Sequence, residues 1–95
     1  MPPRSEVLTD REMQIIARAI ADPRRFEILK QVAAGECVAC ADLRMATEIT
    51  AATMSHHLKE LESAGLVEFT KRGKFVDITF VRPRWQAYLS SLNSL

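Results

Sequence analysis

The chain has 95 residues, of which 47% are hydrophobic and 26% charged, and its formal net charge is +1. These values are typical of one small globular domain, and the near-neutral charge excludes a protein that attracts nucleic acid through overall basicity. No apolar run approaches the length of a membrane span, and the N-terminus lacks the basic and then apolar order of a signal peptide. We therefore expect a soluble, cytoplasmic protein with no membrane partner.

The first predicted helix covers about residues 9–21. Thr9 and Glu12 have the spacing of a capping box, in which each side chain binds the backbone N–H of the other residue. Apolar residues then recur at helical spacing, at Met13, Ile16, Ala17 and Ile20. We expect residues 1–8, which include two prolines, to form a flexible tip ahead of a single domain over 9–95.

Two further helices are predicted before residue 48. Asp22 suits the N-cap of the next helix and Pro23 its first position, while Gly35 is typical of a residue that ends a helix. A linker over 36–40 and a short helix over about 41–47 follow.

The helix predicted over about 50–64 has a small and polar outer face. Thr50 is a suitable N-cap, and Gly65 stands where a left-handed residue would end the helix. The core-facing stripe consists of Met54, Leu58 and Leu61. The opposite face, at 100° per residue, carries Ala52, His56, Lys59 and Ser63, flanked by Thr53 and Ser55. His57 lies nearer the stripe, so a half-buried histidine and an outward-facing one are equally good interpretations.

A spacing of two replaces the helical spacing after Gly65. Leu66–Thr70 and Phe75–Val81 both alternate apolar and polar residues, which predicts a β-hairpin over about 67–81. Its tip is basic and contains Lys71, Arg72 and Lys74.

The last predicted helix covers about 84–94, after Pro83 ends the second strand. Its apolar stripe consists of Trp85, Tyr88, Leu89 and Leu92. The complete order is α-α-α-α-β-β-α, a mainly α chain with one hairpin. A short helix, a tight connection, a second helix and then a hairpin indicate a winged helix-turn-helix fold.

This fold predicts binding to double-stranded DNA. The helix over 50–64 would act as the recognition helix in a major groove, and the hairpin tip, or wing, would reach adjacent phosphates. The alternative for the tip is an ordinary solubilising turn. The predicted DNA contacts are Thr50, Ala52, Thr53, Ser55, His56, His57, Lys59, Lys71, Arg72 and Lys74.

The chain resembles the ArsR/SmtB family of winged-helix repressors over about residues 10–92. The similar segments are Ala21–Leu29, Thr53–Leu61, Ala64–Val67 and the wing turn Arg72–Lys74. The resemblance implies a homodimeric transcriptional repressor, not an enzyme, that binds an operator of dyad symmetry and is released by a metal ion or another signal. The family often has Gln and Pro where this chain has Ala51 and Ala52, so no operator sequence is carried over.

A dimer also follows from size, because a chain this short has a small core of its own. Symmetric pairing would bury apolar surface and place two recognition helices one DNA turn apart. The predicted interface residues are Met13, Ile16, Ile20, Trp85, Tyr88, Leu89 and Leu92. The alternative is that part of this set packs inside one chain.

Cys37 and Cys40 have CxxC spacing, and three interpretations stay open. Thiolates at this spacing can hold one soft metal or metalloid ion together. CxxC near a helix start is also typical of thiol-redox chemistry. Third, both cysteines can be small, half-buried packing residues. No cofactor is certain, and a soft ion at Cys37 and Cys40 is one candidate.

Two other classes of function compete with DNA binding. A thiol-redox enzyme would use the CxxC pair, although the βαβ context expected for such a centre is absent. A winged helix can also serve as a protein-docking module.

Overall fold

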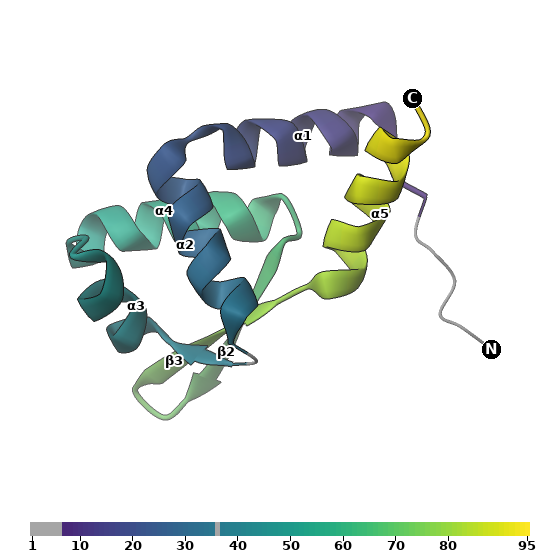
Figure 1. The fold of residues 1–95 in the computed structure, drawn as a ribbon. Coiled ribbons are helices and arrows are strands. Elements are labelled where there is room, and N and C mark those ends of the chain that lie inside the picture. Colours follow the sequence, from purple (N-terminus) through teal and green to yellow (C-terminus); the bar gives the residue numbers. More distant parts are fainter. Residues whose placement is uncertain (1–6, 36) are drawn as a thin grey trace.

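The computed structural model describes residues 7–35 and 37–95, which form five helices and a three-stranded sheet (Figure 1). The elements are α1 (Asp10–Ala21), α2 (Pro23–Ala34), β1 (Val38–Ala39), α3 (Cys40–Thr47), α4 (Ala51–Ser63), β2 (Val67–Arg72), β3 (Phe75–Phe80) and α5 (Arg82–Asn93). The predicted helices and hairpin are therefore present in the predicted order. No helix among the described residues has both the length and the apolar character needed to cross a membrane.

Local capping explains where the first two helices begin. Glu12 N–H donates to Thr9 Oγ1 over 3.1 Å, and Thr9 N–H donates to Glu12 Oε1 over 2.8 Å, so the predicted capping box is confirmed. Asp22 Oδ1 accepts from the backbone N–H groups of Arg24 and Arg25 over 2.9 and 3.0 Å. These side chains satisfy N–H groups that have no partner inside the helix.

The N-terminal boundary differs from the prediction. Residues 1–6 of the predicted flexible tip lie outside the described residues. Leu8, however, is only 8% exposed and belongs to the hydrophobic core. The folded domain therefore begins before residue 9.

Helix α4 ends in the left-handed conformation that its sequence predicts. Gly65 has φ +77°, and its N–H donates to Glu62 O over 2.9 Å. Leu66 N–H donates to Leu61 O over 3.0 Å, which completes a Schellman motif. A Cβ at Gly65 would lie 2.8 Å from Nε of Arg84 in α5, so glycine also allows close packing there. This turn directs the chain from α4 into the wing.

The sheet contains a strand that the sequence does not predict. β3 is central, with β2 on one side and the two-residue β1 on the other, all antiparallel. Val38 pairs with Ile78 and Ala39 with Asp77. The expected linker over 36–40 is wrong in this respect, because two residues carry no alternating pattern and their pairing is set by a distant strand.

Two helix starts are also corrected. α3 begins at Cys40 rather than residue 41, and α5 begins at Arg82 rather than residue 84. The strand β3 ends at Phe80, before Pro83 is reached, and Pro83 lies in the first turn of α5, where its missing N–H is not needed.

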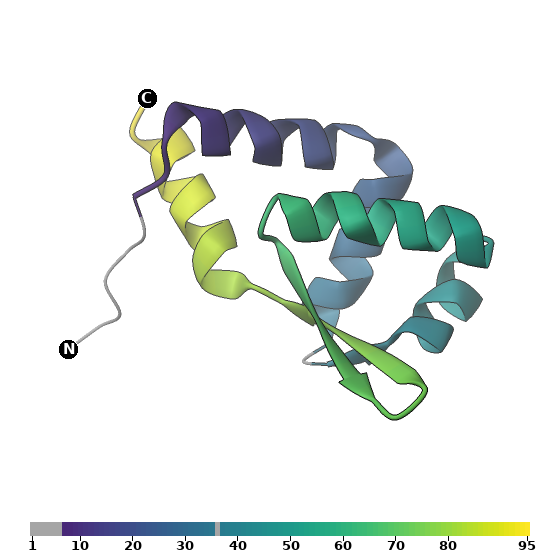
Figure 2. The ribbon, with the colours of Figure 1, turned by 180° about the vertical axis from the view of Figure 1, so that it is seen from behind.

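The helices enclose one core, in which α2 packs against α1, α3, α4 and β3. The side chains that are less than 2% exposed are Ile16, Ile28, Leu43, Met54, Leu61, Leu66, Ile78, Val32 and Val67. Figure 2 shows the molecule from behind: the wing tip and the start of α4 lie at one end, and α5 lies at the other beside the start of α1. The two ends of the molecule therefore present separate surfaces.

Candidate nucleic-acid interface

The connection from α3 to α4 is a tight turn. Glu48 adopts a left-handed conformation with φ 56° and ψ 27°, and its N–H donates to Arg44 O over 2.9 Å. Thr50 then caps α4: Oγ1 of Thr50 accepts from Thr53 N–H over 3.4 Å and donates to Thr53 Oγ1 over 3.0 Å. The hydroxyl groups of Thr50 and Thr53 are thus partly used in capping.

The outer face of α4 is exposed as the helical spacing predicts. Its small residues are Ala52 and Ser55, and its larger ones are His56 and Lys59. The core-facing residues Met54, Leu58 and Leu61 are 0%, 3% and 0% exposed. The first half of the helix therefore offers a low surface of small side chains from which an imidazole and an ammonium project.

His57 does not belong to this outer face. It is 7% exposed, and its Nδ1 has no hydrogen-bond partner among the described residues. Burial lowers the pKa of the imidazole, while the carboxylate of Asp22 at the start of α2 acts in the opposite direction. Of the two interpretations that the sequence leaves open, the structure places this side chain in packing between α4 and α2.

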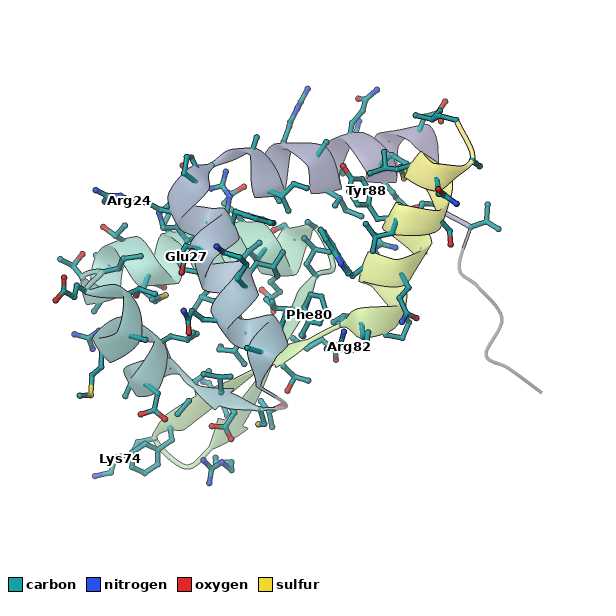
Figure 3. All side chains as sticks on the ribbon, viewed as in Figure 1. Arg24, Glu27, Lys74, Phe80, Arg82 and Tyr88 are labelled. Carbon is teal, nitrogen blue, oxygen red and sulfur yellow. The ribbon has the colours of Figure 1, made fainter. Side chains whose placement is uncertain are left out.

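The three wing cations differ in their surroundings. Lys71 and Lys74 are exposed and form no ion pair within the described parts of the chain. Figure 3 shows Lys74 projecting from the wing tip. Arg72, in contrast, donates to both carboxylate oxygens of Asp77 in β3, with Nη2 and Oδ1 3.1 Å apart. Lys71 and Lys74 therefore have no ionic partner among the described residues, whereas the Arg72 side chain is 65% exposed and paired with Asp77.

Asp77 is unusual because it is a carboxylate with only 5% exposure. The Arg72 guanidinium lowers the pKa of the Asp77 carboxyl, which stays ionised, and the nearby Cys37 thiol adds to this effect. Arg72 thus stabilises the wing from one face of the sheet, whereas Lys71, paired with Val76, lies on the other face beside α4.

The structure places the two cysteines in different surroundings. Cys37 is exposed and interacts with Asp77. Cys40 is half-buried and packs with Val76 and Ile78. Side chains of successive strand residues point to opposite faces, so Asp77 and its neighbours Val76 and Ile78 mark opposite faces of the sheet.

This arrangement does not suit one ion held by both thiolates. Among residues 7–35 and 37–95 there is also no group of three or more His, Cys, Asp or Glu side chains that could hold a metal ion. The CxxC spacing alone does not predict that the two thiols lie on opposite faces of the sheet. That separation comes from the strand β1, which lies between Cys37 and Cys40.

The predicted dimer residues divide into three groups. Ile16 and Tyr88 are 0% and 5% exposed, so the prediction that they form an intersubunit surface is corrected: they pack inside one chain. Met13, Ile20 and Trp85 are partly buried against the core. Leu89 and Leu92 are 45% and 43% exposed, and they project from the end of the molecule far from the wing.

Arg44 of α3, an exposed cation that is not among the predicted contacts, lines a surface cavity together with Lys59 of α4. The sequence does contain a sign of this exposure. Arg44 directly follows the core residue Leu43, and neighbouring residues on a short helix point in different directions, so a buried Leu43 leaves Arg44 facing outward.

Comparisons with known proteins agree with this architecture. The helix-turn-helix domain family matches residues 20–68, more than half of the chain. The chain is also 38% identical over 63 residues to the arsenical resistance operon repressor of Staphylococcus xylosus. That match covers 66% of this chain and 60% of the repressor.

Two solved structures show the same fold. An ArsR-like transcriptional regulator from Rhodococcus sp. RHA1 superposes with a TM-score of 0.80 at 21% identity, over 88% of this chain and 78% of that chain. The homodimeric winged helix-turn-helix DNA-binding domain of a possible ArsR-family regulator from Mycobacterium bovis gives 0.72 at 25% identity, over 94% and 88%. The resemblance to ArsR-type repressors is thereby confirmed: the chain belongs to the helix-turn-helix domain family and has the fold of the ArsR-like winged helix-turn-helix regulators.

Proposed function

We propose that two copies of this chain bind a DNA operator of dyad symmetry and repress transcription. The observation that carries the proposal is the surface formed by the outer face of α4 together with the unpaired wing lysines. His56 and Lys59 project from a row of small residues, which lets α4 approach base edges closely. Lys71 and Lys74 extend the same surface toward phosphates.

A homodimer supplies the second half of the proposed DNA-binding surface. Leu89 and Leu92 are large apolar residues exposed on α5, and a symmetric contact through them would remove both from water. The Mycobacterium bovis neighbour is described as homodimeric, and the Staphylococcus xylosus relative as an operon repressor. Both descriptions support the proposed assembly and activity.

The test is a double substitution on the outer face of α4. We expect His56→Ala with Lys59→Ala to abolish operator binding in a gel-shift titration, because it removes both projecting groups while the buried stripe stays intact. The dimer should persist in analytical ultracentrifugation. Glu62→Ala with Ser63→Ala, exposed at the far end of α4, is the matched control and should bind normally.

Unchanged affinity of the His56/Lys59 variant would overturn the assignment of this face. If the wild-type chain shows no DNA affinity even at low salt and retains a protein partner instead, the docking-module alternative replaces the proposal.

A thiol-directed signal is the second part of the proposal. Cys37 is exposed and contacts Asp77, which holds Arg72 at the base of the wing. Modification of the Cys37 thiol would disturb that contact and thereby the wing. As(III) and peroxide are suitable reagents, since both act on thiols.

The cysteines are tested one at a time. We expect As(III) or peroxide to weaken DNA binding by the wild type and by Cys40→Ser, and to leave Cys37→Ser unaffected. An undiminished response of Cys37→Ser would assign the signal elsewhere, and an equal requirement for both cysteines would restore a shared site.

A further inference from the structure

A cavity of about 290 Å³ lies between the recognition helix α4 and the wing. Its apolar walls are formed by Leu58 of α4, Phe69 of β2, and Val76 and Ile78 of β3. A cavity of this size is at the lower end of the range for small-molecule sites, which are mostly apolar with a few placed polar groups. These four residues form the apolar floor of the cavity, which therefore suits a small ring or a branched alkyl group.

The rim of the cavity carries positive charge. Arg44 of α3 and Lys59 of α4 both line it, both are exposed, and neither forms an ion pair with any described residue. Ser55 adds one hydroxyl. None of the described lining residues is acidic. Two unpaired cations beside an apolar floor complement an anionic group attached to an apolar body.

We propose that this cavity binds a small organic carboxylate. The apolar body occupies the floor between Leu58 and Phe69, and the carboxylate is held by Arg44 and Lys59. This binding does not depend on the proposed function. The effect of this binding on DNA does rest on the proposed function. Lys59 and Ser55 are proposed DNA contacts, so bound carboxylate and operator DNA compete for the same groups.

The chain contains its own reporter for this cavity. Cys40 lines the cavity and is half-buried, whereas Cys37 is exposed and interacts with Asp77 instead. A ligand in the cavity should protect Cys40 from alkylation and leave Cys37 unprotected. The second cysteine is therefore an internal control in every measurement.

The experiment measures alkylation of both cysteines by iodoacetamide, resolved by mass spectrometry, without DNA. Benzoate is the probe, and benzyl alcohol is its neutral counterpart of similar size. A probe this small is expected to bind with a dissociation constant of about 1 mM. At about 5 mM, benzoate should slow alkylation of Cys40 about sixfold by mass action, and Cys37 should react at an unchanged rate.

Charge is then removed from the rim. Arg44→Gln with Lys59→Gln should abolish the protection, whereas the matched control Lys71→Gln with Lys74→Gln should keep it. Absence of protection in the wild type, or equal protection by benzyl alcohol, would overturn the carboxylate site.

A separate gel-shift titration tests the coupling to DNA. Benzoate should weaken operator binding by about threefold or more, the scale of one exposed charge pair. Protection of Cys40 with unchanged DNA affinity supports the site and contradicts the competition. Protection in a chain that never binds DNA supports the site and overturns only the proposed function.

Discussion

The surfaces at the two ends of the molecule are built from helices of similar length but opposite chemistry. α4 exposes small and polar side chains, with one lysine (Lys59) followed by two glutamates (Glu60 and Glu62), and α5 exposes leucines. Both helices bury an apolar stripe, so stability of the fold explains neither exposed surface. A sterically low surface from which an imidazole and an ammonium project suits base edges and phosphates, while exposed leucines suit another apolar surface. The difference agrees with the two partners that we propose, DNA at one end and a second copy of the chain at the other.

The largest expected effect comes from placing charge on the α5 surface. Leu89→Glu with Leu92→Glu should yield a folded monomer, because both residues are exposed and a buried carboxylate would be costly at the interface. Loss of the second DNA-binding half should lower operator affinity by about 100-fold or more. Analytical ultracentrifugation and gel shift measure the two effects.

Gln86→Glu with Ser90→Glu, at other exposed positions of α5, adds the same charge and serves as the control. A variant at Leu89 and Leu92 that remains dimeric would move the interface away from α5.

The next prediction separates the wing cations from one another. Lys71→Gln with Lys74→Gln should reduce the slope of log affinity against log salt by about 0.9 for each phosphate that the wing no longer neutralises. Arg72→Gln should act differently: it leaves the buried Asp77 carboxylate without its guanidinium, so the thermal midpoint should fall. Salt titrations and thermal unfolding of both variants test this difference.

An unchanged salt slope in the lysine variant would count against phosphate binding by the wing. A lowered slope without loss of thermal stability in Arg72→Gln would show that Arg72 binds phosphate rather than supporting the sheet.

Sequence alone predicts those features that depend on neighbours in the chain. Three helix-end features depend only on residues a few positions apart, so the residue types are enough to identify them. They are the capping box at Thr9, the N-cap at Asp22 and the left-handed residue at Gly65. Helix α4 and the hairpin follow from the spacing of apolar residues. The exposure of the α4 side chains agrees with the helical wheel, since the periodicity that buries one face of a helix exposes the other.

Features set by distant contacts could not be predicted in the same way. The pairing of β1 with β3 joins residues about 40 positions apart, and it separates Cys37 from Cys40 across the sheet. The Arg72–Asp77 pair distinguishes three cations that look alike in sequence. In each case the deciding partner is brought near only by the fold.

The smallest expected effect concerns acid stability and compares two adjacent histidines. His57 is buried and its pKa is lowered from 6.5. Its charged neighbours are Asp22 at the N-cap of α2, Arg24 and Arg25 of α2, and His56 of α4. A lowered pKa means that the folded chain keeps His57 neutral when the unfolded chain has taken up a proton. The free energy of unfolding is therefore unaffected by His57 above about pH 6.5. Below that pH it falls, by at most about 1.4 kcal/mol per pH unit.

Urea unfolding at about pH 7.5 and about pH 5.5 measures this dependence. His57→Gln should reduce the loss of unfolding free energy between the two values, because glutamine does not titrate. His56→Gln, one residue away on the exposed face, should leave the loss unchanged. If the His56 variant instead flattened the pH dependence, the exposed histidine would be the group coupled to folding, and the separation of roles between the two faces of α4 would be contradicted.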